Sequence, residues 1–127
     1  MSSPSTIAAG RIRTPEECAQ AQLDAYNTGD ITTFAAVYAD DVQLMDLSTG
    51  VVFCSGRPAL IERYGTLFQR NPSLHCTLLS RIVAPPFVID EEHVVGLAEQ
   101  PVHAVATYEV HGGEIQRAWF LREQPSA

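Results

Sequence analysis

Asp46 is the residue of this sequence whose type and position point most directly at chemistry. It lies in the stretch Val42–Leu47, where strict period-2 alternation places it on the same side of a strand as Val42 and Leu44. Charging a carboxyl group on an apolar side is costly, so its pKa rises towards the pH at which it can take and return protons. The pattern therefore predicts a general base at Asp46.

The residues that follow Asp46 allow a second interpretation. Ser48-Thr49-Gly50 is typical of a hairpin turn, in which the Asp46 carboxylate could accept hydrogen bonds from backbone N–H groups. Such bonds would lower its pKa instead of raising it. The direction of the pKa shift therefore separates a base from a turn residue.

The segments that must position Asp46 begin with a helix. Thr14 is a typical N-cap, Pro15 suits the first helical position, and Glu17 completes a capping box. Gly29 is a typical stop signal at the far end. We therefore expect a helix that begins at Pro15 and ends just before Gly29.

Two further helices are predicted before and after the Asp46 strand. Asp30 can cap a shorter helix that ends at Asp40-Asp41, with a buried stripe formed by Phe34, Val37 and Tyr38. A third helix is expected to begin at Ser55-Gly56-Arg57-Pro58 and to end at Asn71-Pro72.

The remaining apolar segments predict strands. One strand over residues 42–47 meets Val51–Cys54 across the turn, and others are expected over residues 74–83, 94–99, 102–110 and 115–121. The run Asp90-Glu91-Glu92-His93 predicts an acidic, solvated turn, and Gly112-Gly113 predicts a hairpin. Helices followed by a run of strands are typical of an α+β fold with an antiparallel sheet curled around helices.

Composition limits the classes of function. With 127 residues, we expect a flexible arm over residues 1–13 and a single domain over residues 14–123. The net charge of -7 argues against binding to nucleic acid or to an anionic membrane. No apolar run reaches the roughly 18 residues of a membrane span, and no secretory signal is recognised, so a cytoplasmic location is expected.

The cysteines and histidines do not form a metal-binding pattern. Cys18, Cys54 and Cys76 are far apart, and we expect buried, reduced thiols. The four histidines lack metal-ligand spacing, so neither a metal nor another cofactor is expected. His75 opens a strand and could either reach a pocket as a second acid or base or lie at a sheet edge.

Several short sequence words carry a family resemblance. They are Ala25-Tyr26-Asn27-Thr28-Gly29-Asp30, Tyr38-Ala39-Asp40-Asp41-Val42, Asp46, Ser55-Gly56-Arg57-Pro58-Ala59-Leu60-Ile61 and Gly113-Glu114-Ile115. In this order they resemble the nuclear transport factor 2-like superfamily, especially its steroid Δ-isomerase-like branch, related to ketosteroid isomerase. The resemblance implies a cone-shaped curved antiparallel sheet wrapped around three N-terminal helices, with an internal apolar pocket. It also implies a homodimer through the outer sheet face.

The resemblance also suggests roles for individual residues. Asp46 occupies the position of the proton-transfer base, whereas Gln22 and Ala106 stand where the family has its two oxyanion donors. Tyr38 and Tyr64 match tyrosines that support the oxyanion hole, although both also suit a packed core. The remaining pocket residues are expected to be Tyr26, Phe68, Ala106, Tyr108, Ala118 and Phe120.

Three functions are compatible with these residues. The first is a cofactor-independent proton-transfer enzyme, an isomerase, that acts on a small apolar carbonyl-type substrate with Asp46 as base. The second is a non-catalytic domain of the same fold that binds a small apolar molecule or dimerises. The third is an Asp/His dehydratase or polyketide-cyclase-like enzyme, which requires His75 and Asp46 in one cavity.

Overall fold

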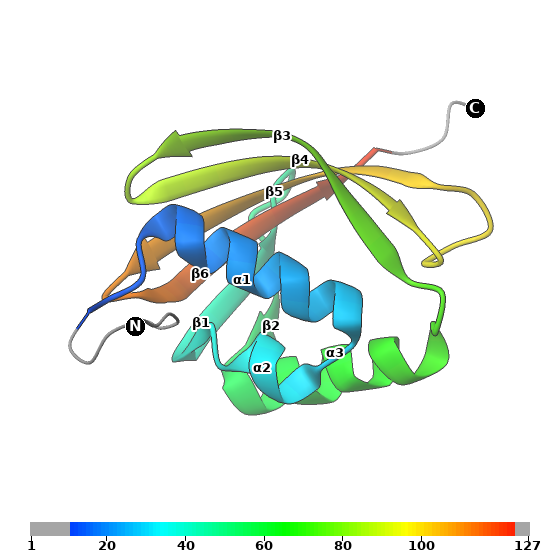
Figure 1. Cartoon of the computed structure of the whole chain (residues 1–127), viewed down its shortest axis with the longest axis horizontal. Helices are drawn as coiled ribbons and strands as arrows, with labels where there is room; N and C mark the ends of the chain where they lie inside the picture. Colours follow the sequence, from blue (N-terminus) through cyan, green and yellow to red (C-terminus); the bar gives the residue numbers. More distant parts are fainter. Residues whose placement is uncertain (1–10, 124–127) are drawn as a thin grey trace, which may run out of the picture.

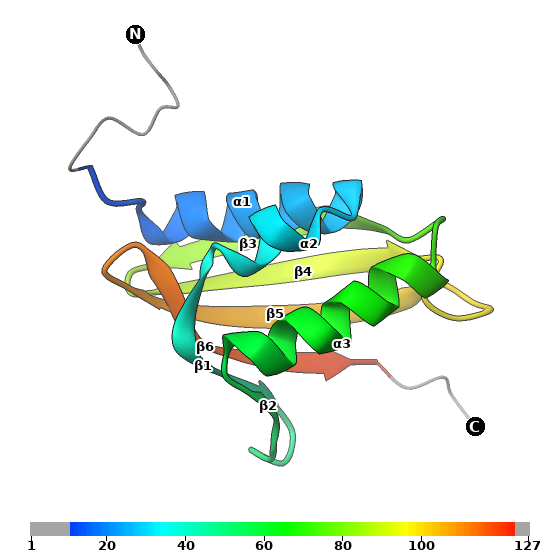
Figure 2. The same cartoon turned by 90° about the horizontal axis from the view of Figure 1, so that it is seen from below.

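Three helices lie on one side of a curved six-stranded sheet (Figures 1 and 2). The computed structural model describes residues 11–123. The helices are α1 (Pro15–Thr28), α2 (Ile31–Ala35) and α3 (Arg57–Arg70). The strands are β1 (Tyr38–Asp46), β2 (Val52–Ser55), β3 (His75–Ala84), β4 (Phe87–Val95), β5 (Val102–His111) and β6 (Glu114–Arg122). The expected α+β fold is confirmed.

The strand order is β2-β1-β6-β5-β4-β3, and the sheet does not close on itself. Every neighbouring pair is antiparallel except β1 and β6, which run parallel. The parallel pair arises because α3 carries the chain from one edge of the sheet to the other. The meander from β3 to β6 then returns to β1, so the sheet is mixed and not wholly antiparallel.

Helix α1 begins and ends at the predicted signals. The Thr14 side chain accepts a hydrogen bond from the Glu17 backbone N–H, and the Glu17 side chain accepts one from the Thr14 N–H. Gly29 ends the helix in the left-handed region, with φ 71°. The predicted arm lies mostly outside the described residues, although Arg11 within it forms an ion pair with Glu17 at 2.8 Å.

The second helix is shorter than predicted. It ends at Ala35, and Tyr38, which we expected on its buried stripe, instead begins β1. The exposed pair Asp40-Asp41 therefore lies within a strand and does not end a helix. The pairing of β1 with β6 replaces the helical bonds that a short isolated segment cannot sustain alone.

The predicted acidic turn at residues 90–93 is wrong. Strand β4 runs through it without a break and pairs with both β3 and β5. Alternation along β4 turns Asp90 and Glu92 inwards beside Val88 and Val94, while Glu91 is turned outwards. A run of acidic residues is typical of a turn, but here two carboxyl groups enter the interior.

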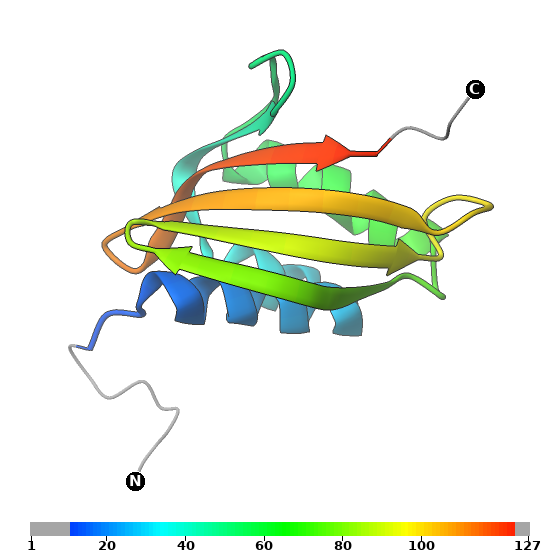
Figure 3. The same ribbon diagram turned by 90° about the horizontal axis from the view of Figure 1, so that it is seen from above.

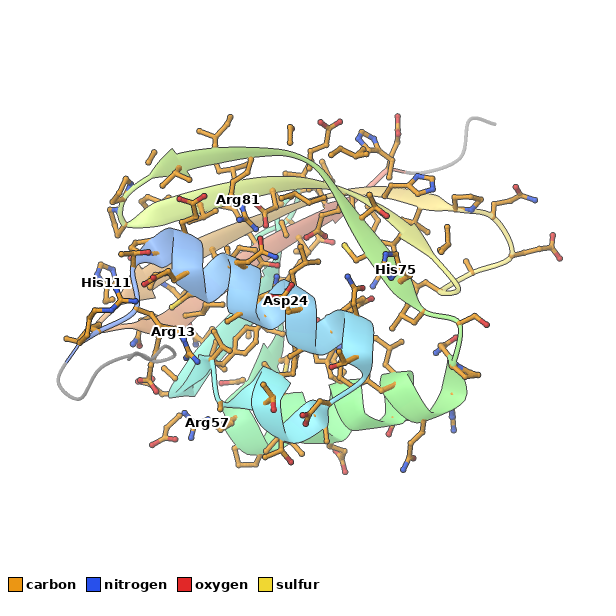
Figure 4. All side chains as sticks on the ribbon, viewed as in Figure 1. Arg13, Asp24, Arg57, His75, Arg81 and His111 are labelled. Carbon is orange, nitrogen blue, oxygen red and sulfur yellow. The ribbon has the colours of Figure 1, made fainter. Side chains whose placement is uncertain are left out.

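Asp90 is neutralised by an arginine on the neighbouring strand. Its fully buried carboxylate accepts hydrogen bonds from Arg81 Nε at 2.7 Å and from the second guanidinium nitrogen at 3.0 Å. Arg81 also donates to Gln20 of α1 at 3.0 Å, and Figure 4 shows it reaching towards that helix. The pair therefore ties the sheet to α1 and fixes β4 in the interior.

Two further features concern the described helices and the cysteines. None of the helices in residues 11–123 has both the length and the apolar character needed to cross a bilayer. Cys18, Cys54 and Cys76 are all buried and free.

Arg81→Met tests the importance of the buried ion pair. The variant leaves the Asp90 carboxylate buried without its cation, so we expect the free energy of unfolding to fall by roughly 3–5 kcal/mol. Urea unfolding measures the loss. Arg70→Met, at an exposed position at the end of α3, is the control and should cost at most about 1 kcal/mol. Equal losses in the two variants would contradict the account.

Candidate active site

A cavity of about 360 Å³ lies between the three helices and the concave face of the sheet. Seven of the residues predicted for the site line it: Gln22, Tyr26, Tyr38, Asp46, Tyr64, Tyr108 and Phe120. Phe34 and Cys76 add to the same wall. The fold therefore brings residues that lie far apart in the sequence together in one cavity.

Four predicted residues do not line this cavity. His75 is exposed at the start of β3 (Figure 4), so it does not share the cavity with Asp46. Phe68 packs behind the wall, with its ring centroid 5.6 Å from that of Tyr26. Ala106 and Ala118 are fully buried in the main core, where small side chains let the sheet pack closely.

Asp46 lines the cavity at the end of β1, where it pairs with Phe120 of β6. Its Oδ1 atom accepts hydrogen bonds from the Ser48 N–H at 2.8 Å, the Ser48 hydroxyl at 2.6 Å and the Thr49 N–H at 3.1 Å. The bond from the Ser48 hydroxyl contributes most to lowering the pKa of Asp46. The pKa of Asp46 is therefore lowered, as the turn interpretation predicts, and not raised, as an apolar environment would require.

The three close hydrogen bonds to Asp46 all end on the same oxygen. Among residues 11–123, Oδ2 accepts no bond of comparable length, although the nearby Thr49 hydroxyl also helps to lower the pKa. The turn therefore fixes the carboxylate through Oδ1 and leaves Oδ2 available to a ligand. Asp46 can therefore serve both as the turn residue, through Oδ1, and as a base, through Oδ2.

Glu92 is a second carboxyl group in the same cavity, and the sequence interpretation missed it. Its side chain is largely buried, with 8% exposure. Burial, followed by the negative charge of Asp90, raises the pKa of Glu92 from 4.5 to about 7. The Cys76 thiol beside it and the more distant Arg81 offset only part of that rise.

Several tyrosines and the Gln22 amide line the same cavity as Glu92. Tyr38 donates a hydrogen bond to Gln22 Oε1 at 3.3 Å, and Gln22 Nε2 donates to the Ala19 carbonyl at 3.1 Å. Burial raises the pKa of Tyr64 to about 12 and that of Tyr108 well above its usual value. The phenols therefore remain protonated and can act as hydrogen-bond donors.

Two arginines complete the lining. Arg63 of α3 lies over the Phe53 ring, 4.6 Å from its centroid, and Arg122 ends β6. Both were absent from the predicted site because an arginine in a sequence looks like an ordinary surface residue.

For Glu92 the sequence did contain a signal: the alternation of Val88, Asp90, Glu92 and Val94 fits one face of a strand.

The chemistry of this arrangement follows from its two carboxyl groups. Hydrogen bonds keep Asp46 ionised, whereas burial keeps Glu92 largely protonated up to about pH 7. Carboxyl groups whose surroundings push their pKa values apart are suited to act as base and acid in one reaction. The cavity therefore holds a proton acceptor, a proton donor and apolar walls.

The curved sheet, the helices that cover one face of it and the cavity between them are those of a nuclear transport factor 2-like protein. Within that class, the chain belongs to the SnoaL-like domain family, which matches residues 19–118. The resemblance to the nuclear transport factor 2-like superfamily is thereby confirmed. Comparison with curated proteins gives no match.

Solved structures share the fold. An uncharacterized cystatin fold protein from Novosphingobium aromaticivorans is 25% identical, with a TM-score of 0.78, over 87% of this chain and 99% of that one. A hypothetical protein with a ketosteroid isomerase-like fold from Catenulispora acidiphila, in complex with trimethylamine, is 19% identical, with a TM-score of 0.69, over 86% of each chain. An NTF-2 like protein of unknown function from Burkholderia xenovorans is 17% identical, with a TM-score of 0.72, over 88% and 84%.

The raised pKa of Glu92 predicts a pH-dependent stability. Its contribution is fully present below the unfolded pKa of 4.5 and is lost as the pH rises through about 7. Relative to E92Q, the wild type should lose about 3 kcal/mol across this interval, the equivalent of the pKa shift. Urea unfolding of both proteins over this range provides the measurement.

E91Q is the matched control, since Glu91 is adjacent on β4 but faces outwards to His103 and Ser80, which lower its pKa. Its effect on stability should appear at low pH and have the opposite sign. A constant difference between the wild type and E92Q from pH 4.5 to above 7 would show that the Glu92 pKa is not raised.

Proposed function

We propose that the protein is a cofactor-independent proton-transfer enzyme, of the isomerase type, for a small apolar carbonyl compound. The observation that carries the proposal is the pair of carboxyl groups, Asp46 and Glu92, in one cavity with pKa values shifted in opposite directions. Asp46 acts as the base through Oδ2. Glu92 acts as the acid, a role that had no candidate because Gln22 and Ala106 stand where the family has its two oxyanion donors.

The reaction needs no further reactant. Asp46 Oδ2 removes a proton from the carbon next to the carbonyl group, and the C–H electron pair moves to form an enol or enolate. Protonated Glu92, assisted by the Tyr38 or Tyr64 hydroxyl, stabilises the oxygen on which the charge develops. Asp46 then returns its proton to the same carbon or to a conjugated one, and the second outcome is an isomerisation.

The fixed Asp46 carboxylate supports this assignment. A lowered pKa makes it a weaker base, but three hydrogen bonds to Oδ1 hold Oδ2 at one position relative to a ligand in the cavity. A positioned group needs no reorganisation when the reaction begins. The weaker base then relies on Glu92 to make the substrate proton more acidic.

Hydrogen–deuterium exchange of small cyclic ketones, followed by proton NMR in D2O, tests the activity. We expect D46N and E92Q each to lower the exchange rate by at least roughly 100-fold. The wild-type rate should fall as the pH rises through about 7, because Glu92 then loses its proton, whereas E92Q should show no such fall.

Two controls share the strands of the tested residues. D41N changes an exposed carboxyl group on β1, and E91Q changes an outward-facing one on β4. Both should exchange at the wild-type rate. Wild-type activity in D46N would remove the proposed base, and wild-type activity in E92Q would remove the proposed acid.

A non-catalytic small-molecule-binding domain is the second candidate. The observation that favours it is the satisfied hydrogen bonding of the Asp46 Oδ1 atom and of the Gln22 amide. The trimethylamine bound to the Catenulispora protein supports small-molecule binding by this fold. Ketone binding without any exchange would favour this candidate. The Asp/His dehydratase or cyclase is not proposed, since His75 lies outside the cavity.

We propose in addition a homodimer through the outer face of the sheet. All three helices lie on the other face (Figure 3), so none of them covers this one. Trp119 of β6 alternates with the cavity-side residues Ala118 and Phe120, with the Phe87 ring 6.4 Å away and the Arg117 guanidinium 5.8 Å away. Apolar residues on both faces of β6 favour a second copy as the cover.

Light scattering coupled to size-exclusion chromatography tests the dimer. The wild type should elute with twice the mass of the chain, and Trp119→Glu should convert it to a monomer, because a carboxylate would be buried without a partner. Val51→Glu, at an exposed position before β2, is the control and should leave the mass unchanged. A monomeric wild type would refute the proposal.

A further inference from the structure

The arginines of this chain divide into two groups. All eight basic residues are arginines, and four of them form ion pairs: Arg11, Arg57, Arg81 and Arg117. The other four, Arg13, Arg63, Arg70 and Arg122, form no ion pair with any residue from 11 to 123. Two of these four, Arg63 and Arg122, line the cavity.

Arg63 and Arg122 belong to the exposed end of the cavity. Both residues are exposed, whereas Glu92 and Tyr108 line the same cavity with exposures of 8% and 2%. Arg63 comes from α3 and Arg122 from the end of β6, where it pairs with the cavity residue Ala104. The cavity therefore has a deep end at Glu92 and a mouth at the two arginines.

The mouth is positively charged in a protein of net charge -7. Two guanidinium groups stand there against one carboxylate, Asp46, whose charge is already shared with three hydrogen-bond donors. The contact with the Phe53 ring restricts Arg63 and keeps it at the rim. Arginine is the side chain best suited to bind a carboxylate, through two parallel N–H bonds.

We propose that the ligand is an amphipathic carboxylate, with a ring system in the cavity and its carboxylate at the mouth between Arg63 and Arg122. This inference rests on the proposed function for the reacting end, since it places the substrate carbonyl at Glu92 and the carboxylate at Arg63 and Arg122. The substrate class is then a cyclic or aromatic keto acid. A cavity of about 360 Å³ is within the range that encloses such molecules.

Calorimetric titration with two probes of equal shape tests the proposal. The probes are 2-naphthoate and its neutral amide, at low salt and at about pH 6, where the acid is ionised and Glu92 is mostly protonated. We expect the wild type to bind naphthoate about tenfold more tightly than the amide. That ratio corresponds to one good charge-assisted interaction.

Variants locate the source of the preference. R63Q and R122Q should each reduce it, and the double variant should abolish it without weakening amide binding. R70Q, which changes an arginine of α3 that lies outside the cavity and forms no ion pair within residues 11–123, should keep it. Thermal melting confirms that each variant is folded, as expected at exposed positions.

The outcomes separate this inference from the proposed function. E92Q should still prefer naphthoate even though it has lost exchange activity, so an inactive wild type with an intact preference would refute only the proton-transfer proposal. Equal affinities for the two probes, binding of neither, or a preference that survives in the double variant would overturn the keto-acid ligand.

Discussion

Strand β4 brings two carboxyl groups into an interior of low polarity. One of them is stabilised in its charged form by an arginine and the other is not, and the cavity chemistry depends on this difference. Asp90 is fully buried and has Arg81 as its cation, at 2.7 Å. Glu92, two residues further along the same face, has no arginine at comparable distance within residues 11–123. Because a buried carboxyl group without a partner cation cannot readily ionise, its pKa rises to about 7.

The Asp90–Arg81 pair also affects Glu92 directly. The negative charge of Asp90 is the second contribution to the raised pKa, after burial. Arg81 reaches across to Gln20 and so fixes the helix whose Gln22 and Tyr26 line the cavity. The structural ion pair thus helps to hold the cavity wall in position, and the charge of Asp90 adds to the rise in the pKa of Glu92 that burial causes.

Asp46 differs from Glu92 because its surroundings stabilise the charged carboxylate. It ends β1 at the rim, where the Ser48-Thr49 turn stabilises the charged form, so it remains ionised where Glu92 does not. A helix-covered sheet that is open at one end creates both surroundings in one cavity: an exposed mouth and a buried interior. The division of acid and base roles follows from depth in the cavity more than from residue type.

Much of this arrangement was predictable from the sequence. The capping box at Thr14, the Gly29 stop and the Gly112-Gly113 hairpin fixed their elements because each signal acts within a few residues. Asp46 and several of the tyrosines were recognised from short motifs that occur along the chain in the order typical of the family. By contrast, Glu92 was missed because Asp90-Glu91-Glu92 looks like a turn until Arg81, on another strand, is brought to Asp90. For His75 the sequence left two positions open, a pocket and a sheet edge, because alternation does not say which face of an edge strand is covered; in the structure its side chain is exposed.

The most direct test of the account is a crystal structure of the protein soaked with a small phenol, which resembles the enolate of a cyclic ketone. We predict that the ring occupies the cavity, with its hydroxyl oxygen within hydrogen-bond distance of Glu92 and a ring carbon facing Asp46 Oδ2. A phenol bound elsewhere, or bound in the cavity with its oxygen turned away from Glu92, would contradict the acid and base roles assigned to this pair.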